Sequence, residues 1–144
     1  MKEMLKIAVD FDGTIVEHKY PDIGKERLFA FETLKALINE GHQLILWTIR
    51  TGKELDEAVE YCRKNGVEFY AVNKNYPEEV YEEGVTSRKV LADIYIDDRN
   101  VGGFLGWGEI YHLINPDAGL SSDEEMRRIK ASRKSGSWLK KLFQ

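Results

Sequence analysis

The sequence predicts a three-layer α/β domain, in which helices cover a central parallel sheet. Short apolar runs alternate with longer segments that repeat apolar residues at helical spacing, and this alternation is typical of the class. The chain has 144 residues, of which 42% are hydrophobic and 32% are charged. That length favours a single domain, and that composition is sufficient for a core of its own.

Five strands and two helices are expected before residue 114. The strands are short buried runs, and each helix stops at a glycine suited to a left-handed cap, Gly41 or Gly66. The expected strands cover residues 6–11, 43–48, 67–72, 92–97 and 109–113, and the expected helices cover residues 25–40 and 53–65. Residues 73–87 are polar around Asn75-Tyr76-Pro77, and we expect a connecting loop there with a helical turn near residues 78–82.

Charge divides the chain into an acidic body and a basic tail. Residues 118–144 contain 7 Lys and Arg against 3 Asp and Glu, a net charge of +4, and the rest contains 14 against 22, a net charge of −8. We therefore expect one domain over residues 1–116 and a basic helical tail over residues 117–144, where Ser122 and Glu125 form a capping-box pattern. An acidic body argues against a broad nucleic-acid-binding face. We expect the tail to dock on this body or to be disordered beyond Gly136, with a membrane or partner groove as the alternative target.

The cysteine content and the apolar runs exclude several classes of protein. Cys62 is the single cysteine, which excludes an internal disulfide framework and a thiolate zinc cluster. No apolar run approaches the roughly 20 residues that a transmembrane helix needs, and the N-terminus has no signal-peptide pattern. We therefore expect a soluble, cytoplasmic protein.

Polar residues that carry chemistry follow three of the expected strands. In an open parallel sheet, ligands bind beyond the carboxyl ends of the strands. Four carboxylates gathered at one such edge repel one another unless a cation lies among them, and an all-oxygen ligand set favours Mg²⁺. We therefore expect a metal-assisted phosphate site. Its candidate residues are Asp10, Asp12, Gly13, Thr14, Thr48, Arg50, Asp97 and Asp98.

The spacing of the first two acids suits a reaction at phosphorus. Asp10 and Asp12 are two residues apart, so in an extended chain they lie on the same face, about 6.6 Å apart. One carboxylate can then attack phosphorus while the other handles the proton of the leaving group. Gly13 permits a sharp turn that presents the amides of residues 12–14, and so of Thr14, to an anion. Exposed acidic pairs are common, and it is the position directly after a buried strand that makes this pair informative.

Four segments resemble, in order, the motifs of the haloacid dehalogenase (HAD) superfamily. Asp10-Phe11-Asp12-Gly13-Thr14-Ile15-Val16 resembles the first motif, and the strand that ends in Thr48 resembles the second. Lys89 resembles the basic residue of the third motif, and Ile94-Tyr95-Ile96-Asp97-Asp98 resembles the acidic fourth motif. The match covers residues 5–114, and it implies a Rossmann-like, HAD-type domain.

The resemblance implies roles for the acidic residues. Asp10 is the implied nucleophile, which forms an aspartyl-phosphate and also binds Mg²⁺. Asp12 is implied to protonate the leaving group, then to activate water, and its backbone carbonyl is an implied metal ligand. One or both of Asp97 and Asp98 complete the implied metal site, although Gly102 stands where the commonest fourth motif has a further acid.

The implied phosphate ligands are Thr48 and Lys89. Lys89 is only eight residues before Asp97, so Arg88 competes with it for this role and Lys74 is a weaker competitor. Arg50 follows Thr48 by two residues and could bind a second anionic group, and an ordinary surface arginine is the alternative interpretation.

Both positions at which the superfamily inserts cap domains are short. Residues 15–24, and the stretch of about sixteen residues before Lys89, are too short to fold with a core of their own. We therefore expect no cap domain and an open site. Such a site suits a macromolecular substrate, or a small one held under the surface of a partner.

The expected function is Mg²⁺-dependent hydrolysis of phosphomonoesters through Asp10. The substrate is a phosphorylated small molecule or an exposed phosphate group. One alternative is a regulatory or binding module that keeps the fold without useful turnover. Another is a phosphatase that acts on nucleotides or on nucleic-acid ends.

Overall fold

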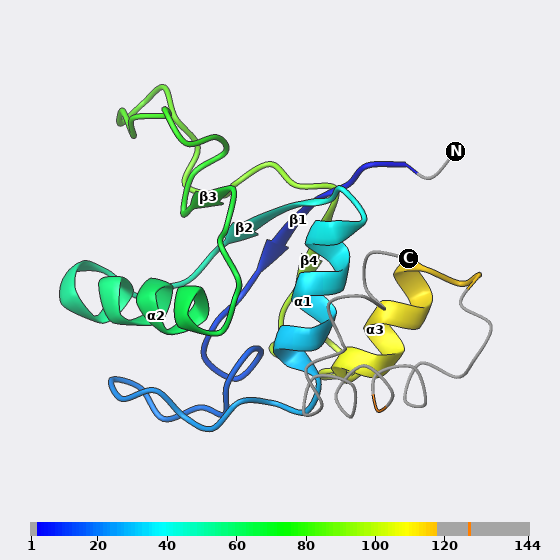
Figure 1. The fold of residues 1–144 in the computed structure, drawn as a ribbon. Helices are drawn as coiled ribbons and strands as arrows, with labels where there is room; N and C mark the ends of the chain where they lie inside the picture. The colour runs from blue at the N-terminus through cyan, green and yellow to red at the C-terminus, as the bar shows by residue number, and fades with distance from the viewer. Residues whose placement is uncertain (1–2, 118–126, 128–144) are drawn as a thin grey trace.

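The computed structural model describes residues 3–117 and Arg127 (Figure 1). These residues form an α/β fold with one four-stranded, all-parallel sheet in the order β3-β2-β1-β4. The strands are β1 (Lys6–Val9), β2 (Gln43–Leu46), β3 (Ala71–Val72) and β4 (Ile94–Ile96). The register places Val9 beside both Leu46 and Ile96. The chain therefore leaves β1, β2 and β4 at the same level, so that the residues after these strands meet at one edge.

Three helices pack on one face of the sheet. They are α1 (Ala30–Asn39), α2 (Gly52–Lys64) and α3 (Trp107–Ile114), and α1 packs beside α3 (Figure 1). The core between these helices and the sheet is made of apolar side chains that are almost completely buried, among them Ile7, Val9, Leu44, Leu46, Phe31, Leu34, Leu37, Cys62 and Trp107. Cys62 lies in this core, and burial raises the pKa of its thiol to about 12.

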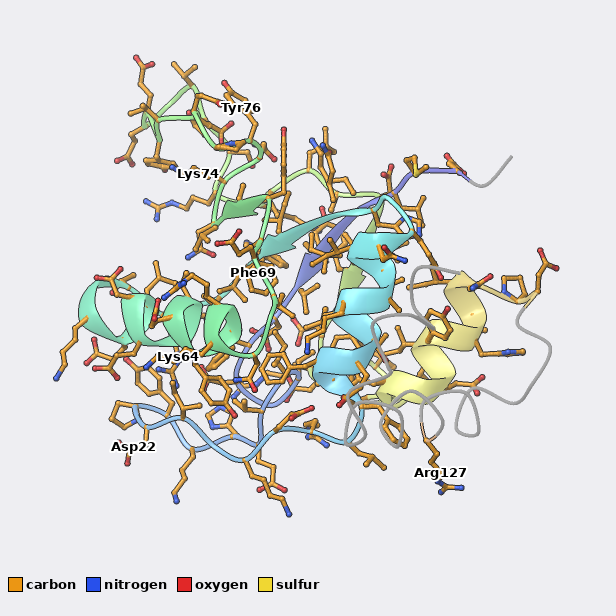
Figure 2. All side chains as sticks on the ribbon, viewed as in Figure 1. Asp22, Lys64, Phe69, Lys74, Tyr76 and Arg127 are labelled. Carbon is orange, nitrogen blue, oxygen red and sulfur yellow. The ribbon has the colours of Figure 1, made fainter. Side chains whose placement is uncertain are left out.

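The opposite face of the sheet differs from the expected three layers. Its apolar residues, Ala8, Ile45 and Ala71, are covered by Val90, and within residues 3–117 no helix packs there. The connection from β3 to β4 runs back across β1 and β2, so a right-handed crossover must pass over this face. That connection contains Pro77 and a polar run, and it folds into turns that project beyond β3 around Tyr76 (Figure 2).

The expected strand at residues 109–113 is wrong, because these residues belong to helix α3. Trp107, Ile110, Tyr111 and Ile114 are spaced i, i+3, i+4 and i+7, which is a helical period, and all four pack on the main core. The indole N–H of Trp107 donates a hydrogen bond of 2.8 Å to the backbone carbonyl of Thr14. Helix α3 thus supports the turn that follows β1.

The expected helix at residues 25–40 starts later, at Ala30. Residues 25–27 instead pair with the segment after the first turn, since Glu17 N–H donates to the Lys25 carbonyl at 2.8 Å and Arg27 N–H donates to the Ile15 carbonyl at 2.9 Å. The expected strands at residues 67–72 and 92–97 shorten to Ala71–Val72 and Ile94–Ile96. The boundaries of these elements depend on hydrogen bonds to segments that are distant in the sequence, and local periodicity does not predict such bonds.

The tail prediction lies outside the described residues, except for Arg127, which is exposed. Within the described part of the chain, no helix has the length and apolar character that crossing a membrane requires.

Candidate active site

A tight turn after β1 carries the first group of candidate residues. Phe11 is completely buried, and its carbonyl accepts hydrogen bonds from the backbone N–H groups of Thr14 at 3.1 Å and Ile15 at 2.9 Å. Gly13 has φ +86°, and a Cβ at this position would overlap the carboxylate of Asp98. Position 13 therefore requires a glycine for two reasons. Its φ is positive, and the Asp98 side chain, which follows β4, leaves no room for a Cβ.

Three carboxylates meet at this turn. Asp10, Asp97 and Asp98 each offer an oxygen, and these oxygens all lie within 4.8 Å of one another. The hydroxyl of Thr14 lies between two of the acids, 3.3 Å from an Asp10 oxygen and 3.2 Å from an Asp98 oxygen. The backbone N–H of Arg99 donates to the Asp97 carboxylate at 2.9 Å, which holds that side chain at the end of β4. The expected meeting of the strand-end acids is thus confirmed for these three.

The electrostatics of the cluster favour a cation. The pKa of Asp10 is raised from 3.8 to about 7, first because burial removes water from its carboxylate and then because the Asp97 charge lies close by. Interaction with Asp98 raises it further, against a backbone hydrogen bond from Phe11 that lowers it. A divalent cation among the three oxygens would relieve this repulsion, and carboxylate oxygens are what Mg²⁺ prefers. The residues therefore fit a metal ion.

The carboxylate of Asp12 does not join this cluster. It is bound at both oxygens by Arg50, whose Nε and Nη2 donate to it at 2.7 Å each. The two residues are 38 positions apart, and both are buried. The sequence-based prediction that the backbone carbonyl of Asp12 is a metal ligand stays a prediction.

The expected role of Arg50 in binding a second anion is wrong. The side chain is completely buried. Its guanidinium donates to Asp12, and also to the backbone carbonyls of Pro21, Asp22 and Glu54. A substrate anion would have to displace one of these partners. The alternative interpretation, a surface arginine, is wrong for the same reason, because Arg50 is an internal residue.

Thr48, one of the two expected phosphate ligands, is held by hydrogen bonds on both its backbone and its side chain. The backbone N–H of Thr48 donates to the Asn73 side-chain carbonyl at 2.8 Å, and the Thr48 hydroxyl accepts from the backbone N–H of Arg50 at 3.1 Å. Asn73 was not among the expected site residues. Its position directly after β3, equivalent to those of Asp10 and Asp97 after their strands, is the signal that could have identified it.

Lys89 and Arg88 point to different parts of the structure. The ammonium of Lys89 lies 4.8 Å from the centre of the Tyr95 ring, on strand β4 two residues before Asp97. The guanidinium of Arg88 instead lies over Tyr81 and 3.9 Å from Glu83, within the projecting connection. Because its contact is with β4, Lys89 is the better placed of these two cations to reach the site.

One solved structure is closely similar to this chain. It is described as a conserved protein coded by a locus from Bacteroides thetaiotaomicron, and it is 60% identical. The match covers 79% of this chain and 92% of that chain, with a TM-score of 0.74. The chain belongs to the family of this conserved Bacteroides protein. No protein-family model and no curated protein matches the sequence, so the chemistry of the site has to be argued from its residues.

The close approach of Gly13 to Asp98 leads to a first prediction. We expect Gly13→Ala to abolish the thermal stabilisation by Mg²⁺, because the added Cβ must displace the Asp98 carboxylate. Gly84→Ala is the matched control, because Gly84 has φ +84° and nothing within 4 Å of the position of a Cβ. Both variants carry similar backbone strain, so the comparison isolates the clash. An Mg²⁺-induced shift in melting temperature that is retained in Gly13→Ala would contradict this placement of Asp98.

The raised pKa of Asp10 leads to a second prediction, on pH. Because its folded-state pKa of about 7 is above the unfolded value of 3.8, the contribution of Asp10 to stability is full below about pH 4 and is lost as pH rises through 7. A metal ion must displace the Asp10 proton below pH 7. We therefore expect Mg²⁺ to raise the melting temperature more at pH 8 than at pH 5, in melts compared with EDTA. Equal Mg²⁺ shifts at both pH values would show that Asp10 is not a ligand.

Proposed function

We propose that the protein is an Mg²⁺-dependent phosphomonoester hydrolase of the HAD superfamily, with a Rossmann-like core and no cap domain. The observation that carries this proposal is the cluster of Asp10, Asp97 and Asp98 at the ends of two adjacent parallel strands. Its Asp10 belongs to the segment that resembles the superfamily's first motif. Neighbouring acids favour a cation beside Asp10, which supports the proposal that Asp10 is a metal ligand as well as the nucleophile.

The reaction that we propose has two steps. In the first, an Asp10 carboxylate oxygen forms a bond to phosphorus while the bond to the leaving oxygen breaks, and that oxygen takes the proton of Asp12. In the second, water attacks phosphorus, Asp12 accepts a proton from the water, and the aspartyl-phosphate releases inorganic phosphate. A cation held by Asp10, Asp97 and Asp98 would neutralise charge on the phosphoryl oxygens.

The remaining residues hold the phosphoryl group in this proposal. Thr48 offers its hydroxyl at the end of β2, and Lys89 offers an exposed ammonium next to β4. The backbone N–H groups of Gly13 and Thr14, which were expected to bind an anion, are not part of this proposal, because they donate within the turn to the carbonyls of Val16 at 2.8 Å and Phe11 at 3.1 Å. The segments of residues 15–24 and 73–88, where a cap would be inserted, are short, so that the site is open to a phosphorylated small molecule or to a phosphate group on a larger one.

The proposal is tested with the full chain and a panel of phosphomonoesters. We expect release of inorganic phosphate from p-nitrophenyl phosphate, sugar phosphates or nucleotides in the presence of Mg²⁺, and its loss in EDTA. An oligonucleotide with a terminal 3′- or 5′-phosphate belongs in the same panel, because it tests the nucleic-acid-end alternative. No phosphate release from any substrate, with a folded protein and Mg²⁺ present, would overturn the proposal.

A phosphate-binding module with slow turnover is the second candidate. The observation that favours it is the engagement of both Asp12 carboxylate oxygens by Arg50, which restricts the proposed proton carrier. Beryllofluoride, a mimic of the phosphoryl group on an aspartate, distinguishes the two. A module would bind it at Asp10 and show no phosphate release, whereas the hydrolase would show both.

A further inference from the structure

Arg50 is a buried arginine whose guanidinium is completely engaged. Its Nε and Nη2 each donate to the Asp12 carboxylate at 2.7 Å. Nη1 donates to the carbonyls of Pro21 at 3.1 Å and Glu54 at 3.3 Å, and Nη2 also donates to the Asp22 carbonyl at 2.8 Å. A guanidinium has five N–H donors, and these five bonds use all of them.

Two aromatic rings also fix the plane of this guanidinium. Its central carbon lies 5.0 Å from the centre of the Phe11 ring and 5.1 Å from the centre of the Tyr20 ring. Phe11 lies between Asp10 and Asp12 in the turn, so Arg50 contacts the candidate nucleophile's own segment. Such stacking, together with a bidentate pair, fixes both the position and the direction of the carboxylate that is bound.

The bonds of Arg50 also fix the segment of residues 17–25. This segment is closed at its base by the backbone hydrogen bond from Glu17 to Lys25, and its tip is held by the carbonyls of Pro21 and Asp22. Figure 2 shows Asp22 near α2, the helix that supplies the Glu54 carbonyl. One side chain therefore joins three elements at the edge of the site: the turn after β1, the segment of residues 17–25 and the first turn of α2.

We propose that Arg50 is a positioning residue, which directs the Asp12 carboxylate toward the reacting oxygens and locks the segment of residues 17–25 against it. A carboxylate has about four lone-pair positions, and the guanidinium occupies two of them, so two stay available for the substrate. Arg50 contacts no substrate itself in this arrangement. The inference deepens the proposed phosphatase function and rests on it, because Asp12 is directed for a reaction only if that reaction occurs.

The test uses substrates that differ in how much they need a proton donor. A p-nitrophenolate leaves without protonation, whereas an alkoxide needs a proton from Asp12. We expect Arg50→Lys, which keeps the charge but loses the two-pronged bond, to lower kcat for an alkyl phosphate by about a hundredfold. For p-nitrophenyl phosphate we expect a loss of less than about fivefold, and KM values that change by less than about threefold for both substrates, because phosphate binding is unaffected.

The control is Arg63→Lys, an arginine-to-lysine substitution in another bidentate Arg–carboxylate pair. Arg63 binds Glu60 with Nε at 2.8 Å and Nη2 at 2.6 Å on the exposed side of α2, so Arg63→Lys is expected to leave both rates unchanged. Asp12→Asn is expected to show the same leaving-group dependence as Arg50→Lys. The double variant is expected to be no slower than Asp12→Asn, because Arg50 acts through Asp12.

Three kinetic results would overturn the inference. They are an equal loss with both substrates, a gain in turnover, which would mean that Arg50 restrains Asp12, and a further loss when Arg50→Lys is added to Asp12→Asn. Should Arg50→Lys fail to fold, Tyr20→Ala replaces it, because Tyr20 is half exposed and its ring stacks on the guanidinium. Tyr20→Ala is then expected to give a smaller loss of the same selectivity, and unchanged rates would overturn the inference.

Hydrogen exchange separates this inference from the proposed function. If the wild-type chain releases no phosphate from either substrate, the proposed function fails, and the role of Arg50 in directing Asp12 for that reaction fails with it. If phosphate is released, the amides of Tyr20 and of residues 22–24 are expected to exchange faster in Arg50→Lys than in the wild type and in Arg63→Lys. Equal exchange in all three proteins would overturn the proposed locking of this segment, whatever the turnover.

Discussion

Asp10→Asn is expected to lower phosphatase turnover by roughly a thousandfold or more, because a neutral amide replaces the carboxylate that we propose as the nucleophile. The amide is nearly the same size as the carboxylate, so the turn after β1 is preserved. It also removes a charge that burial and Asp97 make unfavourable. We therefore expect metal-free Asp10→Asn to melt at the same temperature as the wild type at pH 8, or higher, while it no longer responds to Mg²⁺.

Asp56→Asn is the matched control for this prediction. Asp56 is an exposed residue of α2, so the same loss of one carboxylate there is expected to leave turnover and the Mg²⁺ response unchanged. Turnover by Asp10→Asn within tenfold of the wild type, measured with freshly purified protein, would show that Asp10 is not the nucleophile.

Arg50→Met is expected to have the largest effect on stability. It leaves the Asp12 carboxylate without its partner at a buried position, and it also leaves the carbonyls of Pro21, Asp22 and Glu54 without their donor. Breaking a buried ion pair from one side costs about 3–5 kcal/mol. We therefore expect urea-induced unfolding to show a loss of this size, which is a large part of the stability of a domain of this length.

Two further variants test why Arg50→Met is destabilising. Adding Asp12→Asn to Arg50→Met removes the unpaired charge, so the double variant is expected to be more stable than Arg50→Met alone. Arg63→Met, in an exposed pair, is expected to unfold at the wild-type urea concentration. A loss below about 1 kcal/mol in Arg50→Met would mean that the pair contributes no more than a surface salt bridge.

Local patterns in the sequence predicted some elements closely and others wrongly. The strand expected at residues 6–11 is present but ends at Val9, and α2 differs from its expected range by one residue at each end. The strand expected at residues 109–113 is wrong because the helical spacing of these apolar residues is evident only when Trp107 is included. The first part of the helix expected at residues 25–40 failed because residues 25–27 pair with residues 15–17.

The meeting of Asp10, Asp97 and Asp98 was determined by the sequence alone. Asp10 and the adjacent pair Asp97-Asp98 each follow an apolar run, and parallel strands in register bring the residues after them to one edge. No side-chain detail is needed for that conclusion, because the period of a strand and the direction of the chain are sufficient. The raised pKa of Asp10 is caused first by burial, which only the folded turn produces, and then by the nearby charge of Asp97.

Only the tertiary structure decided what Arg50 and Asp12 do. The sequence places both next to a strand end, as it places Asp10 and Thr48, and offers no sign that one is completely buried. Their pairing depends on the path of residues 17–25, whose carbonyls complete the partners of the guanidinium. A buried arginine is stable only where every donor finds an acceptor. Three of the five acceptors are the backbone carbonyls of Pro21, Asp22 and Glu54, and because every residue has such a carbonyl, side-chain identity cannot predict them.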